Sequence, residues 1–552
     1  MAPNCFIASG KKLRIGILTR DIERLENWEL RIFKGIIDHP YLELCLLIKD
    51  GRDQPQKHPR ASSAVAAALF SIQMKIESLV FRKKRTVDAA EIINSVNGIE
   101  TIRLNPVRDG FMDIFSEEDS GRVKACGLDI ILKHEFCVIN GDIVKAARYG
   151  IWNLHHADTA INRGSGPAGF WEMVHNEPCC GVTLQQLTEE PGCGLVIGKA
   201  WYNWFFSFLK TNNDLLENSV ALLFKNINRL LDQGSVDLDN PLSRYSMLEE
   251  NPALKDILAY TAKFYLKAFA YIFNALLPLK RMNCWALCFG SGSFLDANLS
   301  GIIPVAPPKN EFWADPFLYE YNNQLYVFFE TYPYKTKRGK LSAGKVAESG
   351  KGKYTVTGVQ DVLACDYHLS YPQIIREDGE LFMMPETHQN KRLEVYHCVE
   401  FPGKWELYAT AFNGEEIVDP TYFCDGNGDR WLLVNKGWTH EAELHIYKID
   451  NLKLGSITAH SQNPVILDCM KGRNGGGIFM YNGEYFRPSQ INAHGFYGKG
   501  LQISKIRKLT LEEFKDEPVI TVEPKFLKGL TGMHHLHHFE KNFVFDVCFK
   551  RL

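Results

Sequence analysis

The strongest constraint on this chain is a repeat in its C-terminal half. Five segments there share one pattern, which is a short strand, a turn and then an aromatic strand. Equivalent positions are separated by 56, 48, 57 and 58 residues and are occupied by Pro316, Pro372, Pro420, Gly477 and His535. This spacing suits four-stranded blades arranged around one axis. The repeat therefore predicts an all-β five-bladed propeller over residues 305–552.

The N-terminal part of the chain has a different hydrophobic pattern. Two short apolar runs, Leu13–Leu18 and Leu42–Ile48, are separated by an amphipathic stretch, which is the pattern of strand, helix and strand. Polar and basic residues then interrupt the pattern, and it resumes at Asp129–Leu132 and Gly150–Leu154. Strands that alternate with helices form a parallel sheet. We therefore expect an α/β, Rossmann-like domain over residues 11–205.

Helical periodicity dominates residues 206–304, which we expect to form a helical connector. Within it, the apolar segment Leu258–Leu277 is long enough to raise the question of a membrane span. Lys263 and Lys267 are four residues apart and share one helix face, which argues against a span. The segment is then expected either to pack between the domains, the interpretation we favour, or to make a peripheral contact with a membrane surface.

Charge and composition exclude some partners. The 552 residues contain 63 Lys and Arg against 65 Asp and Glu, mixed without a basic stripe, so nucleic-acid binding is not expected. The stretch Met1–Arg14 lacks a charged region followed by an apolar one, and the 14 cysteines are scattered through a large chain. These features favour the cytoplasm, with the apolar helix as a point of membrane association.

One segment of the N-terminal part carries a candidate catalytic motif. A strand ends in Asn153-Leu154-His155, a loop follows with Arg163-Gly164-Ser165-Gly166-Pro167, and a later strand begins Gly181-Val182-Thr183. This order resembles the signature of folate-dependent formyltransferases. The resemblance implies a formyltransferase-like fold, N10-formyltetrahydrofolate as the cofactor, Asn153 as the donor to the tetrahedral oxyanion and His155 as the base.

The chain departs from that family at one position. Formyltransferases complete the site with an Asp in a following Asp-x-Gly turn, and Gly192 stands there in this sequence. Glu189 and Glu190 lie three and two residues upstream and are alternative carboxylates for the same role. Loss of catalysis is an open alternative, as is a purely structural role for Asn153 and His155 at the end of a strand.

The propeller repeat predicts a second site, because inner strands converge on the central axis. Carboxylates, an arginine and aromatic side chains together suit a sugar, and we expect no metal. The candidate substrate-binding residues are Trp313, Asp315, Tyr371, Gln373, Glu386, Asp419, Arg487, Gln490, His534 and His535.

The sequences of these strands include the motifs WADPF, VDPT and RPSQ. They resemble the propeller module at the N-terminus of plant glucosamine inositolphosphorylceramide transferases. It is similar, more loosely, to five-bladed glycoside hydrolases, which pair a base Asp, an orienting Asp and an acid Glu. That resemblance implies Asp315 as base and Asp419 as orienting residue. The acid has no counterpart, because Glu484 lies in a turn and Arg487 occupies the strand. Sugar binding therefore competes with hydrolysis, and the Asp-Pro pairs can also be structural caps.

Three hypotheses for function follow. The first is a transferase of glycan or lipopolysaccharide biosynthesis that moves a formyl or related acyl group to an amino sugar, with the propeller holding a nucleotide sugar or glycolipid. The alternative is a carbohydrate-processing or carbohydrate-binding propeller, for glycosyl transfer or hydrolysis, joined to a formyltransferase fold without catalysis. In the third, both modules are binding surfaces in a biosynthetic assembly at a membrane.

Overall fold

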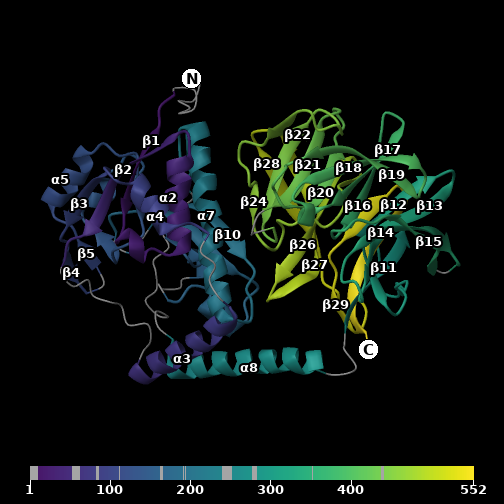
Figure 1. The fold of residues 1–552 in the computed structure, drawn as a ribbon, viewed down its shortest axis with the longest axis horizontal. Coiled ribbons are helices and arrows are strands. Elements are labelled where there is room, and N and C mark those ends of the chain that lie inside the picture. Colours follow the sequence, from purple (N-terminus) through teal and green to yellow (C-terminus); the bar gives the residue numbers. More distant parts are fainter. Residues whose placement is uncertain are drawn as a thin grey trace. The chain divides into compact units, whose positions relative to one another are not determined.

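The chain folds into two compact units, Met1–Ala268 and Phe269–Leu552, each with its own hydrophobic clusters (Figure 1). The computed structural model describes residues 10–52, 63–81, 86–110, 112–161, 166–190, 192, 194–238, 252–276, 282–350, 352–436 and 440–551. Among the residues in these ranges, no helix combines the length and the apolar character needed to cross a membrane.

The first unit is built on a seven-stranded sheet. Its strand order is β10-β9-β8-β6-β1-β2-β3, and β9 alone runs antiparallel to its neighbours. The order of the five parallel strands reverses between β1 and β6, which places a switch point at their carboxyl ends. The α/β expectation is confirmed at this level. The strands are β1 (Leu13–Leu18), β2 (Leu42–Asp50), β3 (Glu100–Leu104), β6 (Ile130–Lys133), β8 (Ile151–His155), β9 (Cys180–Leu187) and β10 (Gly194–Tyr202), with a small second sheet of β4 (Val107–Asp109), β5 (Met112–Ile114) and β7 (Val138–Asn140).

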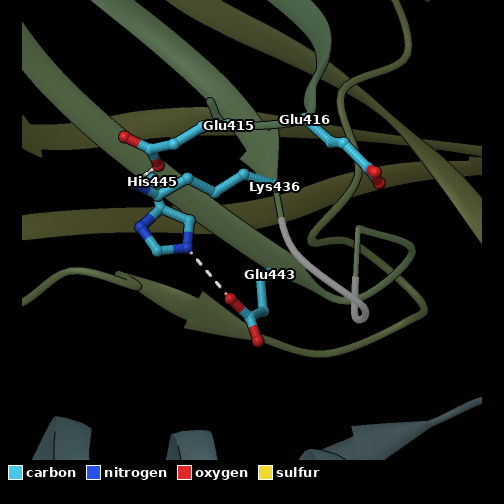
Figure 2. Close-up of a pocket in the computed structure, with 5 residues that line it drawn as sticks. All are labelled: Glu415, Glu416, Lys436, Glu443 and His445. Atoms are coloured by element: carbon cyan, nitrogen blue, oxygen red, sulfur yellow. Dashed lines mark hydrogen bonds and ion pairs between the residues drawn. The ribbon is translucent and has the colours of Figure 1, made fainter. Parts of the chain in front are cut away.

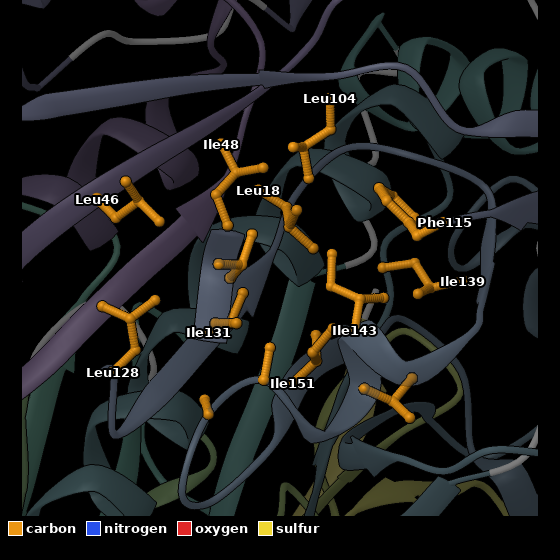
Figure 3. Packing of buried hydrophobic residues seen from close by; sticks show 14 of the residues in the cluster. Leu18, Leu46, Ile48, Leu104, Phe115, Leu128, Ile131, Ile139, Ile143 and Ile151 are labelled. Carbon is orange, nitrogen blue, oxygen red and sulfur yellow. The ribbon is translucent and has the colours of Figure 1, made fainter. Parts of the chain in front are cut away.

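Helices pack against this sheet through apolar stripes. The longest, α7 (Phe208–Gln233), begins at Ser207, whose side chain accepts from the Lys210 backbone, and ends at Gly234 in the left-handed conformation. It packs against β9, β10 and α2. Figure 3 shows one of the unit's clusters, where strand and turn residues such as Leu18, Ile131 and Ile151 meet. The other helical elements are η1 (Ile22–Arg24), α2 (Asn27–Asp38), α3 (Ala64–Val80), α4 (Ala89–Ser95), α5 (Glu117–Ala125), η2 (Asp142–Lys145), η3 (Thr159–Ile161), α6 (Phe170–His175) and α8 (Leu254–Leu276).

The expected connector over residues 206–304 is helical only in part. Its first helix, α7, packs on the α/β sheet, and α8 follows. After the helices comes a strand, β11 (Met282–Ser291), and then a short turn, η5 (Phe294–Asp296). Strand β11 pairs along its length with β31, at the other end of the second unit. Such a pairing over more than 250 residues leaves no local signal in the sequence, so helical periodicity alone misplaced this segment.

The second unit is a five-bladed β-propeller. Four antiparallel sheets follow one another along the chain, and β30, β31 and the early strand β11 make the fifth, which closes the ring. Inner strands of neighbouring sheets contact each other. The strands are β12 (Glu311–Tyr321), β13 (Gln324–Pro333), β14 (Lys340–Glu348), β15 (Tyr354–Leu363), β16 (Ser370–Glu377), β17 (Glu380–Glu386), β18 (Leu393–Glu400), β19 (Lys404–Ala411), β20 (Ile417–Cys424), β21 (Arg430–Lys436), β22 (Glu443–Ile449), β23 (Ile457–Ala459), β24 (Ile466–Leu467), β25 (Phe479–Tyr481), β26 (Glu484–Ala493), β27 (Phe496–Leu509), β28 (Phe514–Val522), β29 (Leu530–Gly532), β30 (Leu536–Phe539) and β31 (Asn542–Arg551), and η6 (His388–Asn390) lies in the second blade.

A bulge recurs in the inner strands of the first three blades. The pairing register shifts around Asp315, Tyr371 and Asp419, each of which precedes a proline. Their φ angles are 50°, 51° and 44°, in the left-handed region that residues with a Cβ avoid. Backbone strain of this kind concentrates at functional sites. The three bulges re-aim side chains that regular alternation would place elsewhere.

Candidate functional site

The centre of the propeller holds a buried polar cluster to which every blade contributes. Its members are less than a tenth exposed. Buried charges of this density must be paired or hydrogen-bonded to be tolerated. The carboxylates are Asp315, Glu330, Glu386, Asp419 and Asp546, and their cationic and amide partners include Arg473, Gln490 and His534.

One half of the cluster is organised around His534. Its Nε2 lies 3.2 Å from Oδ1 of Asp315, and its Nδ1 lies 2.9 Å from Oδ2 of Asp546. The imidazole also packs against the indole of Trp285, with ring centroids 4.1 Å apart. Burial alone would lower the pKa of His534, but the two carboxylates outweigh it and raise that pKa well above its ordinary value. His534 is therefore a cation held between two anions.

The same three residues have the spacing of a metal site. Ligand atoms of Asp315, His534 and Asp546 all lie within 4.8 Å of one another. A histidine must be neutral to bind a metal. The raised pKa of His534 makes a proton the competitor for that position.

The other half of the cluster is organised around Asp419. Its Oδ2 accepts hydrogen bonds from Nε of Arg473 at 2.7 Å and from Nε2 of Gln490 at 3.0 Å. Its backbone N–H donates to Oε2 of Glu386 at 2.9 Å. Burial raises the pKa of Asp419 and the guanidinium opposes that rise. The pKa of Asp419 stays well above its ordinary value, and the pair with Arg473 is the interaction that favours its ionised form.

Two glutamates of the cluster have opposite protonation tendencies. Burial favours the neutral form of Glu386, but its hydrogen bond with Nδ1 of His388 at 2.6 Å and the charges nearby hold its pKa below the ordinary value. Burial and the neighbouring Asp315 raise the pKa of Glu330 well above the ordinary value. Environments that separate two carboxyl pKa values in this way are typical of acid and base pairs.

A pocket lies in the third blade. It has a volume of about 280 Å³ and is lined by Glu415, Glu416, Lys436, Glu443 and His445 (Figure 2). The hydrogen bond with Glu386 raises the pKa of His388, and the charge of Glu416 adds a smaller contribution in the same direction. Three of the five lining side chains are carboxylates, so the pocket favours a cationic group.

Five of the candidate binding residues converge as the sequence predicts. They are Asp315, Glu386, Asp419, Gln490 and His534, and each makes at least one contact within the cluster. His535 lies at the edge, with Nδ1 3.6 Å from Asp315 and its ring between Phe317 and Tyr371. Burial and the charge of His534 lower the pKa of His535 well below its ordinary value, so it is neutral.

Three other candidates lie elsewhere. Trp313 belongs to an apolar cluster and packs against Phe329 with centroids 4.8 Å apart, because the bulge at Asp315 breaks the alternation that would put both side chains on one face. Gln373 clamps the backbone of Tyr422 in the next blade through two hydrogen bonds.

Arg487 is also outside the cluster. Its Nη2 donates to Asp516 of β28 at 2.7 Å and to the Lys471 carbonyl at 2.8 Å. Arg487 and Gln490 are three residues apart on one strand, so their side chains point to opposite faces. Only Gln490 can face the axis.

Sequence reasoning missed several members of the cluster. Arg473 lies in a loop before β25, and Asp546 lies in the second strand of its blade, where no repeat position drew attention. Glu330 sits directly in register with Ala314 on the adjacent strand. For His388, the partner of Glu386, the sequence did offer a signal, which is the Glu-x-His spacing at the end of β17.

The N-terminal motif lies at the carboxyl end of β8. Asn153 pairs in register with Lys133 of β6, and His155 pairs with Thr183 of β9. Two residues apart on a strand, Asn153 and His155 share one face. His155 is 9% exposed and Asn153 is partly exposed. Their assigned roles as donor and base stay predictions, and Arg163, Gly164 and Ser165 lie outside the described residues.

Basic side chains surround this strand edge. Burial lowers the pKa of Lys133, and burial with nearby positive charge lowers the pKa values of His134 and His156 to about 3. Both of these histidines are neutral at pH 7 and pack against Trp28, at 5.4 Å and 5.3 Å between centroids.

The carboxylates proposed to orient His155 belong to the hairpin that follows β9. Gln186 pairs with Trp152, so the hairpin after β9, which contains Gly192, lies at the amino end of β8. Glu189 in the same hairpin forms an ion pair with Lys145. Glu189 is engaged by that ion pair, and the hypothesis that Glu190 orients His155 stays a prediction.

Comparison with known proteins concerns the propeller. The family model described as "Glucosamine inositolphosphorylceramide transferase 1, N-terminal" matches residues 302–542. A protein of that name from Oryza sativa subsp. japonica is 33% identical over 239 residues, which are 42% of this chain and 31% of the relative. The Arabidopsis thaliana protein of the same name is 30% identical over 286 residues, 48% of this chain and 35% of the relative.

The chain thus spans about a third of the length of these relatives. The propeller is similar to their N-terminal module, which confirms that part of the resemblance and leaves formyl transfer without support. Among solved structures, similar chains include the β-xylosidase RS223 (13% identity, TM-score 0.33, 44% of this chain and 92% of that chain) and a GH43_1 enzyme from Xanthomonas citri (11%, 0.32, 44% and 88%).

Proposed function

We propose that this chain is a transferase of glycan or glycolipid biosynthesis whose propeller binds an amino sugar. The observation that carries the proposal is the buried cluster of five carboxylates with Arg473, in a propeller that also has an acidic pocket in its third blade. Carboxylates and amides that converge from several strands accept hydrogen bonds from sugar hydroxyls. The related plant proteins bear the name glucosamine inositolphosphorylceramide transferase 1, which supports this substrate class.

The pocket favours an amino group at one position of the sugar. Glu415 is paired with Lys436 at 2.8 Å, and Glu443 with His445 at 3.0 Å; among the described residues, the ion-pair partner of Glu416 is Lys391 at 3.9 Å. Glu416 is therefore the weakest-paired carboxylate of the lining. An ammonium group that enters the pocket would meet its charge first.

The cluster supports binding more directly than hydrolysis. Glu330 and Glu386 differ in protonation tendency, as an acid and a base require. The acid expected in the fourth blade has no equivalent, since Glu484 is half exposed and pairs with Lys505 at 2.8 Å. Sugar held at the cluster would thus be presented for transfer rather than cleaved by two carboxylates across its bond.

Calorimetric titration of the full chain with glucosamine and with glucose tests this proposal. We expect glucosamine to bind at least about tenfold more tightly than glucose, a preference that Glu416→Gln reduces. Glu484→Gln is the matched control, because it removes an exposed carboxylate of the same propeller that is paired away from the pocket. Equal affinity for the two sugars, or an equal effect of both variants, would contradict the proposal.

The finer hypothesis is formyl or acyl transfer in the first unit. Asn153 and His155 share one face at the carboxyl edge of β8, one strand from the switch point, where ligands of such sheets bind. N10-formyltetrahydrofolate would be the donor and the amino sugar the acceptor. Mass spectrometry of N-formylglucosamine, formed from this donor by wild type and by Asn153→Ala, tests it. If no product forms while glucosamine still binds, the hypothesis of formyl transfer is contradicted. The alternative of a formyltransferase-like fold without catalysis would then be favoured.

A further inference from the structure

Helix α3 buries polar side chains and exposes most of its large apolar ones, which is the reverse of the usual arrangement. The side chains it buries are Ala66, Phe70, Gln73 and Glu77, two of which are polar. Large apolar side chains occupy a solvent-facing stripe with spacings of four and three residues, formed by Val65, Leu69, Ile72, Ile76 and Leu79. Val65 is 61% exposed and Leu79 is 75% exposed. This stripe has the regular spacing of a helix face that is made to be covered.

The orientation of α3 is fixed by a buried hydrogen-bond network around Glu77, which we call the hub. Glu77 accepts hydrogen bonds from the Tyr260 hydroxyl at 2.5 Å, the Ser207 hydroxyl at 2.6 Å and the Leu209 backbone at 3.0 Å. Gln73 adds a fourth at 2.9 Å. Rotating the helix to bury its apolar stripe would break this network and leave a buried carboxylate without partners, which is costly. The hydrogen bonds of Glu77 therefore keep the apolar stripe on the solvent side of α3.

Helix α8 lies next to α3 and repeats the arrangement (Figure 1). It buries Ile257, Tyr260 and Phe264. Its exposed side carries Leu258, Tyr265, Leu266, Phe269, Ile272 and Phe273, again at helical spacing, with Leu266 70% exposed and Phe269 66% exposed. Exposed apolar stripes on two neighbouring helices exceed the scattered apolar residues that soluble surfaces normally show.

The charges that accompany these stripes are positive. On the two helices the exposed charged side chains of the described residues are Lys75, Lys255, Lys263 and Lys267. In the sequence, four basic residues from Arg82 to Arg85 follow α3, and they lie outside the described residues. An apolar helix face flanked by lysines is the pattern of an element that lies in the surface of an anionic bilayer.

We propose that α3 and α8 form a membrane-docking face that inserts its apolar side chains into the surface of an anionic lipid bilayer. The face consists of Val65, Leu69, Ile72, Ile76 and Leu79 of α3 and Leu258, Tyr265 and Leu266 of α8, all in the first unit. This inference is independent of the sugar proposal, because none of these residues belongs to the propeller cluster.

Co-sedimentation of the full chain with vesicles tests the proposal. We expect the protein to bind phosphatidylcholine vesicles that contain phosphatidylglycerol, and to bind pure phosphatidylcholine vesicles more weakly. The double variant Ile72→Glu, Leu266→Glu should lose at least about tenfold in vesicle affinity, because two charges would enter the apolar layer. Lys75→Glu, Lys255→Glu should weaken binding to the anionic vesicles alone.

A matched control separates this face from general surface hydrophobicity. Leu407 is 50% exposed on the propeller, so Leu407→Glu should leave vesicle binding unchanged. All substituted positions are exposed, and unaltered melting temperatures would show that the variants fold. Wild-type protein that stays in solution with every vesicle, or Ile72→Glu, Leu266→Glu that binds like wild type, would overturn the proposal. A wild-type dimer by light scattering that this variant converts to a monomer, without vesicle binding, would assign the face to a second copy.

Discussion

Arg473 donates a hydrogen bond from Nε to Oδ2 of Asp419 over 2.7 Å, and both side chains are buried at the centre of the propeller. Removing one partner of a buried pair leaves an uncompensated charge, which costs about 3–5 kcal/mol. Arg473→Met should therefore lower the free energy of unfolding of the propeller by that amount in denaturant titration. Asp419→Asn, Arg473→Met should recover part of the loss. A single variant within about 0.5 kcal/mol of wild type would contradict the pairing.

The Glu386–His388 pair should make stability depend on pH in a defined window. The pKa of Glu386 is lowered from 4.5, so its stabilising contribution is present above 4.5 and lost as the pH falls through the lowered folded value. The pKa of His388 is raised from 6.5, so its contribution is complete below 6.5 and lost as the pH rises through the raised folded value. The pair is therefore most stabilising between these limits.

His388→Gln should thus destabilise most near about pH 6 and least near about pH 9. Denaturant titrations of both proteins across this range measure the difference. A difference that is constant with pH would show that the pair is not charged in the folded protein.

Arg487 should be structural, whereas Gln490 should affect binding. Arg487 is almost fully buried against Asp516, within the fourth blade. Arg487→Met should lower the melting temperature and leave glucosamine affinity unchanged, while Gln490→Leu should weaken that affinity because it removes a donor to Asp419. If Arg487→Met folds but loses glucosamine affinity, Arg487 contributes to binding and the structural role is contradicted.

Gly192→Asp should not create or raise formyl transfer. The register of β9 on β8 directs the hairpin that holds Gly192 toward the amino end of β8. The φ angle of Gly192 is 76°, so a side chain there strains the backbone by about 1 kcal/mol. We expect unchanged turnover and a slightly lower melting temperature. Increased N-formylglucosamine formation by this variant would show that the turn does reach the site.

The repeat allowed much of the second unit to be predicted. Equivalent Asp-Pro positions located Asp315 and Asp419 correctly, because both sit in the same bulge of successive inner strands. The same alignment misplaced Arg487, although strand alternation already separates it from Gln490. Trp313 was misplaced for the opposite reason, since alternation fails at the bulge beside it.

Other features depend on contacts that sequence spacing does not reveal. Asp546 reaches the axis from the second strand of the last blade, and β11 joins that blade from the start of the unit. The outward apolar stripe of α3 follows from the buried hub at Glu77, whose partners come from α8 and the start of α7. Hydrophobic periodicity predicted these helices but not which face each one buries.

A crystal structure of the full chain with glucosamine is the most direct measurement of the central proposal. We predict that the sugar binds with its amine near Glu416 and its hydroxyls within hydrogen-bond distance of the Glu386 and Asp419 side of the cluster. Density for glucosamine elsewhere on the chain, or none at a concentration that saturates binding in solution, would contradict it.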